Sequence, residues 1–299
     1  MNSKESMKLA ISNIAFGKDQ QAALKCVSQS GVEGLVIAPP IIWSDLPEIT
    51  NFSERERKDR LKTMERKARE YRERLGGLGL TVVGLQSLTY ATKDMALFGS
   101  DYERERLAKH LEVQAILAGE LGADSMSFGS PALRKLGGRS YEQAMEEAIG
   151  LFTRVARTAA RNNTQLAIEP LCGYGNEFGI TLEQAEDLTC RIADGLETEN
   201  RLGFGIHPDT AAMYGAGDAP GDLASLIHNH RDSVRGIDAS APDLARLSSA
   251  LDIPQGKYVD ALRSVSYQGW LSLEMKGPLN PDVIEKEIQY IKKQCGLAA

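Results

Sequence analysis

The segment GWLSLEMKG, residues 269–277, contains an apolar run that ends on an acidic side chain. Its two leucines and Met275 alternate with Ser272 and Glu274, as expected for a β-strand whose two faces meet different surroundings. An ionised carboxylate at the end of a buried strand is costly unless a cation, a hydrogen-bond donor or a substrate lies beside it. We therefore expect Glu274 to have such a partner.

Short apolar runs of this kind recur along the whole chain, separated by longer stretches of helical pattern. The predicted strands are residues 8–16, 34–39, 81–88, 124–130, 165–171, 202–209, 234–240 and 270–275. Alternating strands and helices in this number predict a (β/α)8 TIM barrel, and 299 residues suit one such barrel. No linker or low-complexity tract divides the chain, so we expect a single domain over residues 1–299. A doubly wound open sheet is the alternative, but no GxGxxG or GxxxxGK[ST] sequence follows the first strand.

Helix starts are marked by capping boxes, in which a hydroxyl residue precedes a carboxylate or amide residue by three positions. They are Ser53-x-x-Glu56, Ser140-x-x-Gln143 and Thr181-x-x-Gln184. The highly charged stretch after Ser53 has apolar residues at helical spacing, so its arginines and lysines lie on the opposite face. These apolar residues are Leu61, Met64, Ala68, Tyr71 and Leu75. We interpret the stretch as a solvated outer helix rather than a nucleic-acid or membrane patch.

The composition favours a small-molecule partner. The formal net charge of −6 argues against nucleic acid as the main partner, because phosphate binding relies on a basic surface. The four cysteines form no CxxC pair, which argues against a zinc knuckle or a disulfide framework. The chain has no signal-peptide pattern at its start and no apolar run of about 18 residues. We expect a cytoplasmic protein with no membrane partner, and a homo-oligomer is compatible with the sequence.

Acidic residues end four consecutive predicted strands. Glu169, Asp209, Asp238 and Glu274 each follow a small or polar residue by two positions, so that both side chains share one face of the strand. The carboxyl ends of barrel strands form the mouth where active sites are built, so the four acids should converge there. A divalent ion would relieve their repulsion, and an all-oxygen set suits Mn²⁺ or Mg²⁺ better than Zn²⁺. The alternative is that the acids cap helices or pair with arginines.

Several segments, taken in order, carry a family resemblance. KLAISNIAF, GLQSL, FGSP, LAIEPL, DTAAM, ASAPDL and GWLSLE resemble the sugar phosphate isomerase/epimerase family of xylose isomerase-like TIM barrels, which includes ketose 3-epimerases and hydroxypyruvate isomerases. The resemblance implies one divalent ion held by Glu, Asp, His and Glu after strands five to eight, at the positions of Glu169, Asp209, Asp238 and Glu274. It also implies that Glu169 and Glu274 act as base and acid on an enediolate.

Asp238 departs from the family pattern, which has a histidine at this position. Three interpretations follow: Asp238 is still a ligand, it misses the ion, or the site has lost the metal altogether. His207 either fills a barrel layer or compensates for the missing histidine as a ligand or proton carrier. Ala212 and Val36 also replace polar residues of some members, so the resemblance does not transfer a particular substrate.

Five residues are candidate substrate contacts. They are His207, Asn176, Gln86, Arg134 and Trp43. Arg134, with Lys135 and Arg139, lies in the loop after strand four and could bind a phosphate or carboxylate, although a plain solvated loop is the alternative. Asn176 follows strand five near Tyr174 and Phe178, and Trp43 is either a lid or a core residue.

Together these features predict a divalent-metal-dependent isomerase or epimerase of a small sugar or polyhydroxylated carbonyl compound. A lyase or dehydratase on the same scaffold is one alternative, because it would begin with the same proton abstraction. A metal-free ligand-binding or auxiliary protein is the other, because of Asp238.

Overall fold

Eight strands form the centre of the protein. The computed structural model describes residues 7–17, 20–44, 54–250 and 252–297. The strands are β1 (Lys8–Ser12), β2 (Gly34–Ile37), β3 (Thr81–Leu85), β4 (Ser125–Phe128), β5 (Leu166–Ile168), β6 (Phe204–Ile206), β7 (Gly236–Ala239) and β8 (Trp270–Leu273). Each predicted strand is present, but shorter, because the chain leaves the sheet soon after the barrel wall. The first, for example, turns into a 3-10 helix at Asn13–Ala15.

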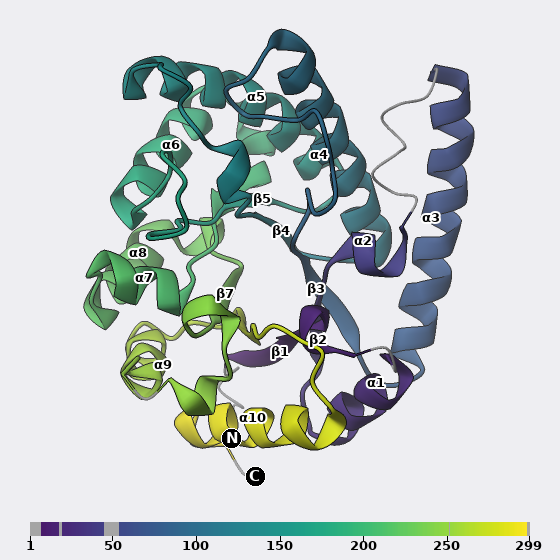
Figure 1. Cartoon of the computed structure of the whole chain (residues 1–299), viewed down its shortest axis with the longest axis vertical. Coiled ribbons are helices and arrows are strands. Elements are labelled where there is room, and N and C mark those ends of the chain that lie inside the picture. Colours follow the sequence, from purple (N-terminus) through teal and green to yellow (C-terminus); the bar gives the residue numbers. More distant parts are fainter. Residues whose placement is uncertain (1–6, 18–19, 45–53, 251, 298–299) are drawn as a thin grey trace.

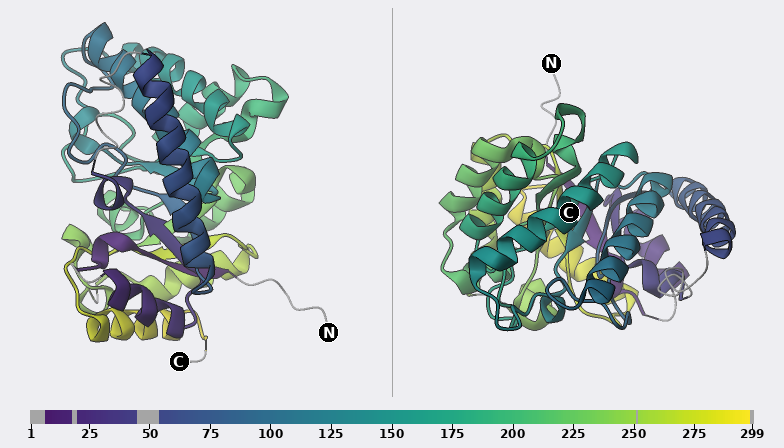
Figure 2. Two further views of the ribbon diagram at one scale, coloured as in Figure 1. Left: turned by 90° about the vertical axis from the view of Figure 1, so that its right-hand side faces the viewer. Right: turned by 90° about the horizontal axis from the view of Figure 1, so that it is seen from above.

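Helices surround these strands (Figure 1 and Figure 2). They are α1 (Gln20–Gln29), α2 (Pro39–Ile42), α3 (Glu54–Gly76), α4 (Asp101–Leu121), α5 (Tyr141–Arg161), α6 (Leu182–Asp194), α7 (Thr210–Ala216), α8 (Pro220–His230), α9 (Gln255–Ser264) and α10 (Pro281–Gln294). The capping box of Ser140 and Gln143 is confirmed at the start of α5. Thr181 caps α6, but the Gln184 amide oxygen accepts from the Ile180 backbone instead. The box predicted at Ser53 lies outside the described residues.

The strands are parallel and follow one another around the sheet in the order β6, β5, β4, β3, β2, β1, β8, β7. β6 and β7 stand at the two ends of this order, and they meet through an isolated bridge between Asp209 and Asp238. At this bridge the Asp238 amide donates to the Pro208 carbonyl at 2.9 Å. The predicted (β/α)8 TIM barrel is therefore confirmed, and its seam between β6 and β7 is paired at the mouth.

A side chain replaces strand pairing at the other end of this seam. Gln165, at the start of β5, is fully buried, and its amide nitrogen lies near three backbone carbonyls. It donates to Leu202 at 3.1 Å, to Phe204 at 3.2 Å and to Asp232 at 3.4 Å. Because these carbonyls come from both sides of the seam, one amide group joins β6 to the segment before β7.

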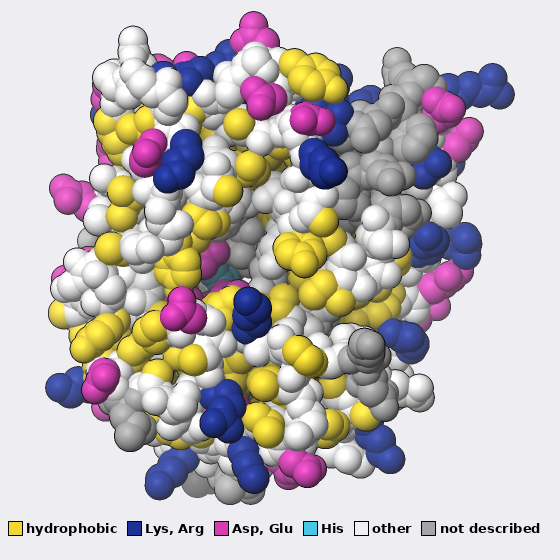
Figure 3. All heavy atoms as spheres, viewed as in Figure 1, with side chains coloured by type: hydrophobic (Ala, Val, Ile, Leu, Met, Phe, Trp, Pro, Cys, Tyr) yellow, Lys and Arg dark blue, Asp and Glu magenta, His cyan; other side chains and the backbone are white. Residues whose placement is uncertain are grey.

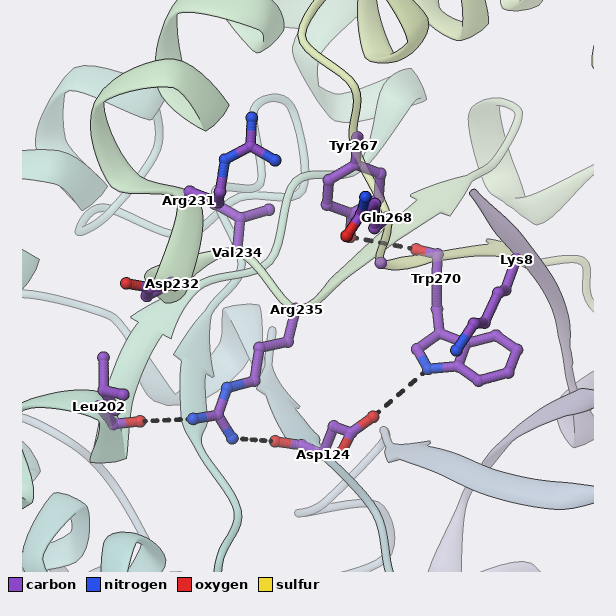
Figure 4. A pocket seen from close by; sticks show the side chains of 11 residues that line it. Lys8, Asp124, Leu202, Arg231, Asp232, Val234, Arg235, Tyr267, Gln268 and Trp270 are labelled. Carbon is purple, nitrogen blue, oxygen red and sulfur yellow. Dashed lines mark hydrogen bonds between the residues drawn. The ribbon is translucent and has the colours of Figure 1, made fainter. Parts of the chain in front are cut away.

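Below the seam, the amino-terminal face has a cavity of about 390 Å³ (Figure 4). Arg235 extends through it and donates to the carbonyls of Asp124 at 2.9 Å and Leu202 at 3.4 Å. The Lys8 ammonium lies 5.3 Å from the ring centre of Trp270. These contacts tie strand starts together, which fits the stabilising role of this face in TIM barrels.

The barrel interior is filled by apolar side chains near its amino-terminal end. Ala10, Val36 and Val83 form a buried cluster with Trp270 against it. Gly34 makes room for the indole, because a Cβ there would lie 2.8 Å from ring carbons of Trp270. The barrel is therefore closed by packing at this end, so a substrate must enter from the mouth.

The charged stretch after Ser53 forms α3, which runs along the outside of the barrel (Figure 2). Its Met64, Ala68 and Leu75 are buried while most of its arginines and lysines are exposed, which confirms the outer helix. In the part of the chain that the structure describes, no helix combines the length and apolar character needed to cross a membrane.

We expect Gly205→Ala to open the seam. A Cβ at Gly205 would lie 2.2 Å from the Ser233 carbonyl oxygen and 2.4 Å from the Gln165 amide oxygen, so backbone must move. The free energy of unfolding should fall by about 1–3 kcal/mol. The matched control is Gly150→Ala in α5, where a Cβ meets nothing within 4 Å and alanine should add about 0.5–1 kcal/mol. Urea denaturation followed by circular dichroism measures both, and equal stability of the two variants would contradict the seam packing.

Candidate metal centre and active site

The four strand-end acids converge at the mouth of the barrel. Glu169 follows β5, Asp209 follows β6, Asp238 lies in β7 and Glu274 follows β8. One carboxylate oxygen from each lies within 4.8 Å of the others. Figure 3 shows acidic and histidine side chains at the bottom of a hollow in this face. The predicted convergence is thus present, because equivalent positions on neighbouring strands of a barrel point to one centre.

Two of these acids are oriented by helix and loop geometry. Asp209 is the N-cap of α7, and its carboxylate accepts from the Ala212 amide at 2.6 Å. Glu169 lies against Gly129 of the neighbouring strand end, where a Cβ would come within 2.5 Å of the Glu169 carboxylate. Gly129 is therefore the residue that leaves space for this carboxylate.

Glu274, the acid that ends the opening segment, has an amide donor as its partner. The Gln86 side chain, at the end of β3, donates to Glu274 at 2.8 Å. The other Gln86 atom, its amide oxygen, is buried without a hydrogen-bond partner. Gln86 was predicted as a substrate contact, and it lines the mouth as well as orienting Glu274.

Asp238 is paired with His207, one strand away. The His207 Nε2 and an Asp238 oxygen are 2.9 Å apart, and both residues are buried. The ring fills the space above Gly236, where a Cβ would lie 3.2 Å from it, so the layer-filling interpretation of His207 fits. Burial opposes a charge on the ring, but Asp238 and the other acids outweigh it and raise the pKa of His207 to about 9. The second Asp238 oxygen is buried without a partner.

The acids are strongly perturbed. Burial, with repulsion from Asp209, raises the pKa of Glu169 to about 8. Burial also raises the pKa of Asp209 to about 6, although its hydrogen bonds oppose the shift. The pKa of Glu274 is raised well above its usual range by burial and by the neighbouring charges. The centre is therefore short of positive charge.

This donor set fits a divalent cation. Glu169, Asp209, Asp238 and Glu274 offer only oxygen, the ligand atom that Mn²⁺ and Mg²⁺ prefer. The unpartnered buried oxygen of Asp238 is the kind of atom that a bound ion satisfies. The replacement of the expected histidine by Asp238 therefore does not prevent a metal site, because the aspartate oxygen lies among the other three.

A cavity of about 170 Å³ opens over the acids. It is lined by Gln86, Ser87, Ser127, Gly129, Ser130, Pro131, Glu169, Leu171, Tyr174, Asp209, Leu244 and Glu274. Its three serines are not among the residues that the sequence pattern predicts for the site. Ser87 and Ser130 follow β3 and β4 with left-handed φ values of 52° and 41°. Applying the strand-end rule to these two strands, and not only to the acidic ones, would have found them.

Arg134 and Asn176, both predicted as substrate contacts, do not line this cavity. Arg134 is fully buried and donates to the carbonyls of Phe178 at 3.1 Å and Gly179 at 3.0 Å. Asn176 also donates to Phe178, at 3.2 Å. Arg134 instead fastens the loop after β4 to the loop after β5, and Asn176 makes its contact within the loop after β5. Both supply donors to backbone carbonyls that would otherwise be buried without one.

Trp43 is likewise a core residue rather than a lid. Only 7% of its surface is exposed, and its ring makes an edge contact with Tyr71 of α3 at a centroid distance of 5.6 Å. Tyr174 is the aromatic side chain that does reach the mouth, where 38% of it is exposed. The helical spacing of apolar residues along α3 predicted its buried face, but it did not predict that Trp43 would cover this face.

The fold and the mouth define an α/β barrel with a carboxylate centre at the carboxyl ends of its strands. Residues 31–294 match the model of the xylose isomerase-like TIM barrel family, and the protein belongs to this family. No curated protein matches the sequence significantly. The family resemblance seen in the sequence is therefore confirmed.

Solved structures agree on the fold. A 3-keto-D-glucoside 4-epimerase from E. coli is 17% identical with a TM-score of 0.71, over 96% of this chain and 100% of that chain. A D-psicose 3-epimerase from Clostridium cellulolyticum H10, solved with D-tagatose, is 15% identical with a TM-score of 0.72, over 97% and 98%. The IolI protein, solved with a zinc atom, is 14% identical with a TM-score of 0.66, over 96% of each chain.

The pKa shifts predict how stability depends on pH without metal. Folding raises the pKa of Glu169 to about 8 and the pKa of Asp209 to about 6. Between the ordinary pKa of each group and its raised value, the folded protein therefore binds more protons than the unfolded chain. Stability must then fall as pH rises through this window. His207, raised to about 9, acts in the same direction. In chelator-containing buffer the melting temperature should fall from pH 5 to pH 8, and Mn²⁺ should restore it most at pH 8. A flat or rising profile would contradict the buried cluster.

We expect Gly129→Ala to weaken the metal centre while leaving the fold intact. The new methyl group would occupy the position of a Glu169 carboxylate oxygen, and this flexible side chain can move away. Affinity for Mn²⁺, measured by isothermal titration, should fall at least about 10-fold, as for lost supporting contacts at metal sites. Gly150→Ala serves as the control and should bind as the wild type does. Unchanged affinity in Gly129→Ala would remove Glu169 from the ligand set.

Proposed function

We propose that this protein is a divalent-metal-dependent isomerase or epimerase of a small sugar or polyhydroxylated carbonyl compound. The proposal rests mainly on Glu169 and Glu274, two carboxyl groups that line one small cavity together with Asp209. Asp238 completes the cluster of four acids. The epimerases among the similar structures act on sugars according to their names, which supports the choice of substrate.

The two glutamates are suited to moving protons on opposite sides of one carbon. A general base works best when its pKa lies near the working pH, and burial raises the pKa of Glu169 to about 8. The pKa of Glu274 is raised well above its usual range, so this side chain can hold a proton and donate it, while Gln86 orients the carboxyl group. One glutamate would remove the proton next to the carbonyl, and the other would return one. Because the two carboxyl groups form a coupled pair, either one can serve as the base.

The same acids would hold the metal ion. Glu169, Asp209, Asp238 and Glu274 would be its ligands, with His207 hydrogen-bonded to Asp238 from behind. When bound, a divalent ion supplies positive charge beside the oxygens of an enediolate and so lowers the barrier to ionisation of the C–H bond. A protonated Asp209 or Glu169 would have to lose its proton on binding, so affinity should rise with pH.

A metal-free ligand-binding protein is the second candidate. The observation in its favour is that His207, with a pKa raised to about 9, already supplies one positive charge to Asp238. Stoichiometric Mn²⁺ binding would exclude this candidate. A chain that takes up no ion and shows no change in melting temperature with Mn²⁺ would favour it.

We expect Glu274→Gln to lose at least about 100-fold in turnover, because proton transfer by one group contributes about 10²–10⁴. Glutamine keeps the shape and the hydrogen-bonding partner Gln86 but cannot carry the proton. Proton NMR in D₂O, with the Mn²⁺-loaded protein and a panel of ketoses, measures exchange of the hydrogen next to the carbonyl.

The matched control is Glu146→Gln, the same substitution at an exposed position of α5. It should exchange as the wild type does, and both variants should keep the wild-type circular dichroism spectrum. Wild-type turnover in Glu274→Gln would remove Glu274 from the mechanism.

A further inference from the structure

The described residues that line the mouth cavity include acids but no lysine or arginine. The acids are Glu169, Asp209 and Glu274. An anionic group of a substrate would lie beside these carboxylates in a partly desolvated site, where like charges repel strongly. One divalent ion would neutralise part of the charge of the carboxylates. The described residues that line the cavity include no further cation that could bind a phosphate group away from the ion.

The loop that was expected to bring cations to the mouth uses them elsewhere. Arg134 is fully buried and does not line the cavity. Its Nη1 donates to two carbonyls of the loop after β5, while Nε and Nη2 are buried without a partner. Lys135 donates to the Gly175 carbonyl and lies 3.9 Å from Glu177. Both side chains therefore bind protein groups in the position where a phosphate-binding loop would present them to a ligand.

Arg139, the third cation of this loop, is also engaged. It pairs with Glu147 of α5 at 2.8 Å and donates to the Gly99 carbonyl at 3.2 Å. Glu147 in turn binds Arg104 of α4 at 2.6 Å, so Arg139 belongs to a network between helices. Its guanidinium stabilises the outer layer of the barrel instead of the mouth.

What the cavity does present is a set of neutral hydrogen-bonding groups. Ser127 of β4 contributes a hydroxyl, as do Ser87 and Ser130, which follow β3 and β4. A hydroxyl can both donate and accept, so Ser130 keeps capacity for a ligand beside its hydrogen bond with Thr89 at 2.7 Å. The buried amide oxygen of Gln86 has no partner, so it can accept from a substrate hydroxyl. Burial and the nearby acids raise the pKa of Tyr174 to about 12, which keeps its phenol protonated as a donor.

From these contacts we infer that the substrate is a neutral polyhydroxy ketone, and neither a phosphate ester nor a carboxylate. This inference rests on the proposed function and narrows it. The serines, Gln86 and Tyr174 would recognise hydroxyl groups of the substrate, while the acids hold the ion and move protons. The carboxylates of this cavity would repel a phosphate group, and no arginine or lysine among the described lining residues would offset that repulsion.

Lys276 is the cation to be tested at the rim. It is exposed two residues after Glu274, and it is not one of the residues that line the cavity. If it took a phosphate from outside, its removal would change the preference between a sugar and its ester. We expect no such change, because a long exposed lysine on a solvated rim gains little from an ion pair.

The experiment compares matched pairs on the Mn²⁺-loaded protein. The neutral probes are D-fructose, D-tagatose and D-xylulose. The anionic probes are D-fructose 6-phosphate, D-tagatose 6-phosphate and D-xylulose 5-phosphate, together with hydroxypyruvate as a carboxylate. Proton NMR in D₂O measures exchange next to the carbonyl. At least one neutral ketose should exchange, and kcat/KM for its phosphate ester should be at least 10-fold lower. Lys276→Ala should change this ratio less than twofold.

The outcomes separate the two proposals. Faster exchange of a phosphate ester or of hydroxypyruvate would overturn the neutral-substrate inference while leaving the isomerase proposal standing. A 10-fold change of the ratio in Lys276→Ala would also overturn it, because Lys276 would then be a phosphate contact. If no probe exchanges, the proposed function fails and the inference fails with it.

Discussion

Repulsion among four buried carboxylates is the constraint on which the mouth of this barrel depends. One oxygen of each lies within 4.8 Å of the others. Burial and the neighbouring charges raise the pKa of Glu169 to about 8 and the pKa of Glu274 well above its usual range. The surroundings relieve this only in part. Gln86 donates to Glu274, the first turn of α7 donates to Asp209, and His207 faces Asp238. The remaining need for positive charge is what a divalent ion would meet, and it links the stability of the fold to its chemistry.

The seam between β6 and β7 decides where two of these acids lie. Backbone pairing there is reduced to one bridge, and that bridge joins Asp209 to Asp238 at the mouth. At the opposite end, Gln165 joins the two sides through its side chain. The barrel is thus closed most directly where the carboxylates meet, so any opening of the seam would separate two of the proposed ligands as well as two strands. A change that weakens the seam would therefore also alter the geometry of the candidate site.

The loops at the mouth show how a family scaffold can be adapted. Arg134 and Lys135 connect the loops after β4 and β5, which holds Tyr174 over the acids as part of a firm wall. Neither of these two cations lines the cavity, so neither is placed to bind a substrate phosphate there. The firm wall and the lack of a lysine or arginine among the described cavity-lining residues therefore have the same physical origin, and both would favour a substrate recognised through its hydroxyl groups.

The sequence by itself determined the eight strands and the convergence of the acids, because alternation along a strand and position at its carboxyl end are local properties that a barrel turns into one rim. It also indicated the buried face of α3. Only the tertiary structure decided where Arg134 and Trp43 point, and that His207 pairs with Asp238 across the seam. These outcomes depend on partners that are distant in sequence, and a long or amphipathic side chain can satisfy itself in several directions. Which partner it finds is settled by packing, since a buried polar group must take the one that the folded chain offers.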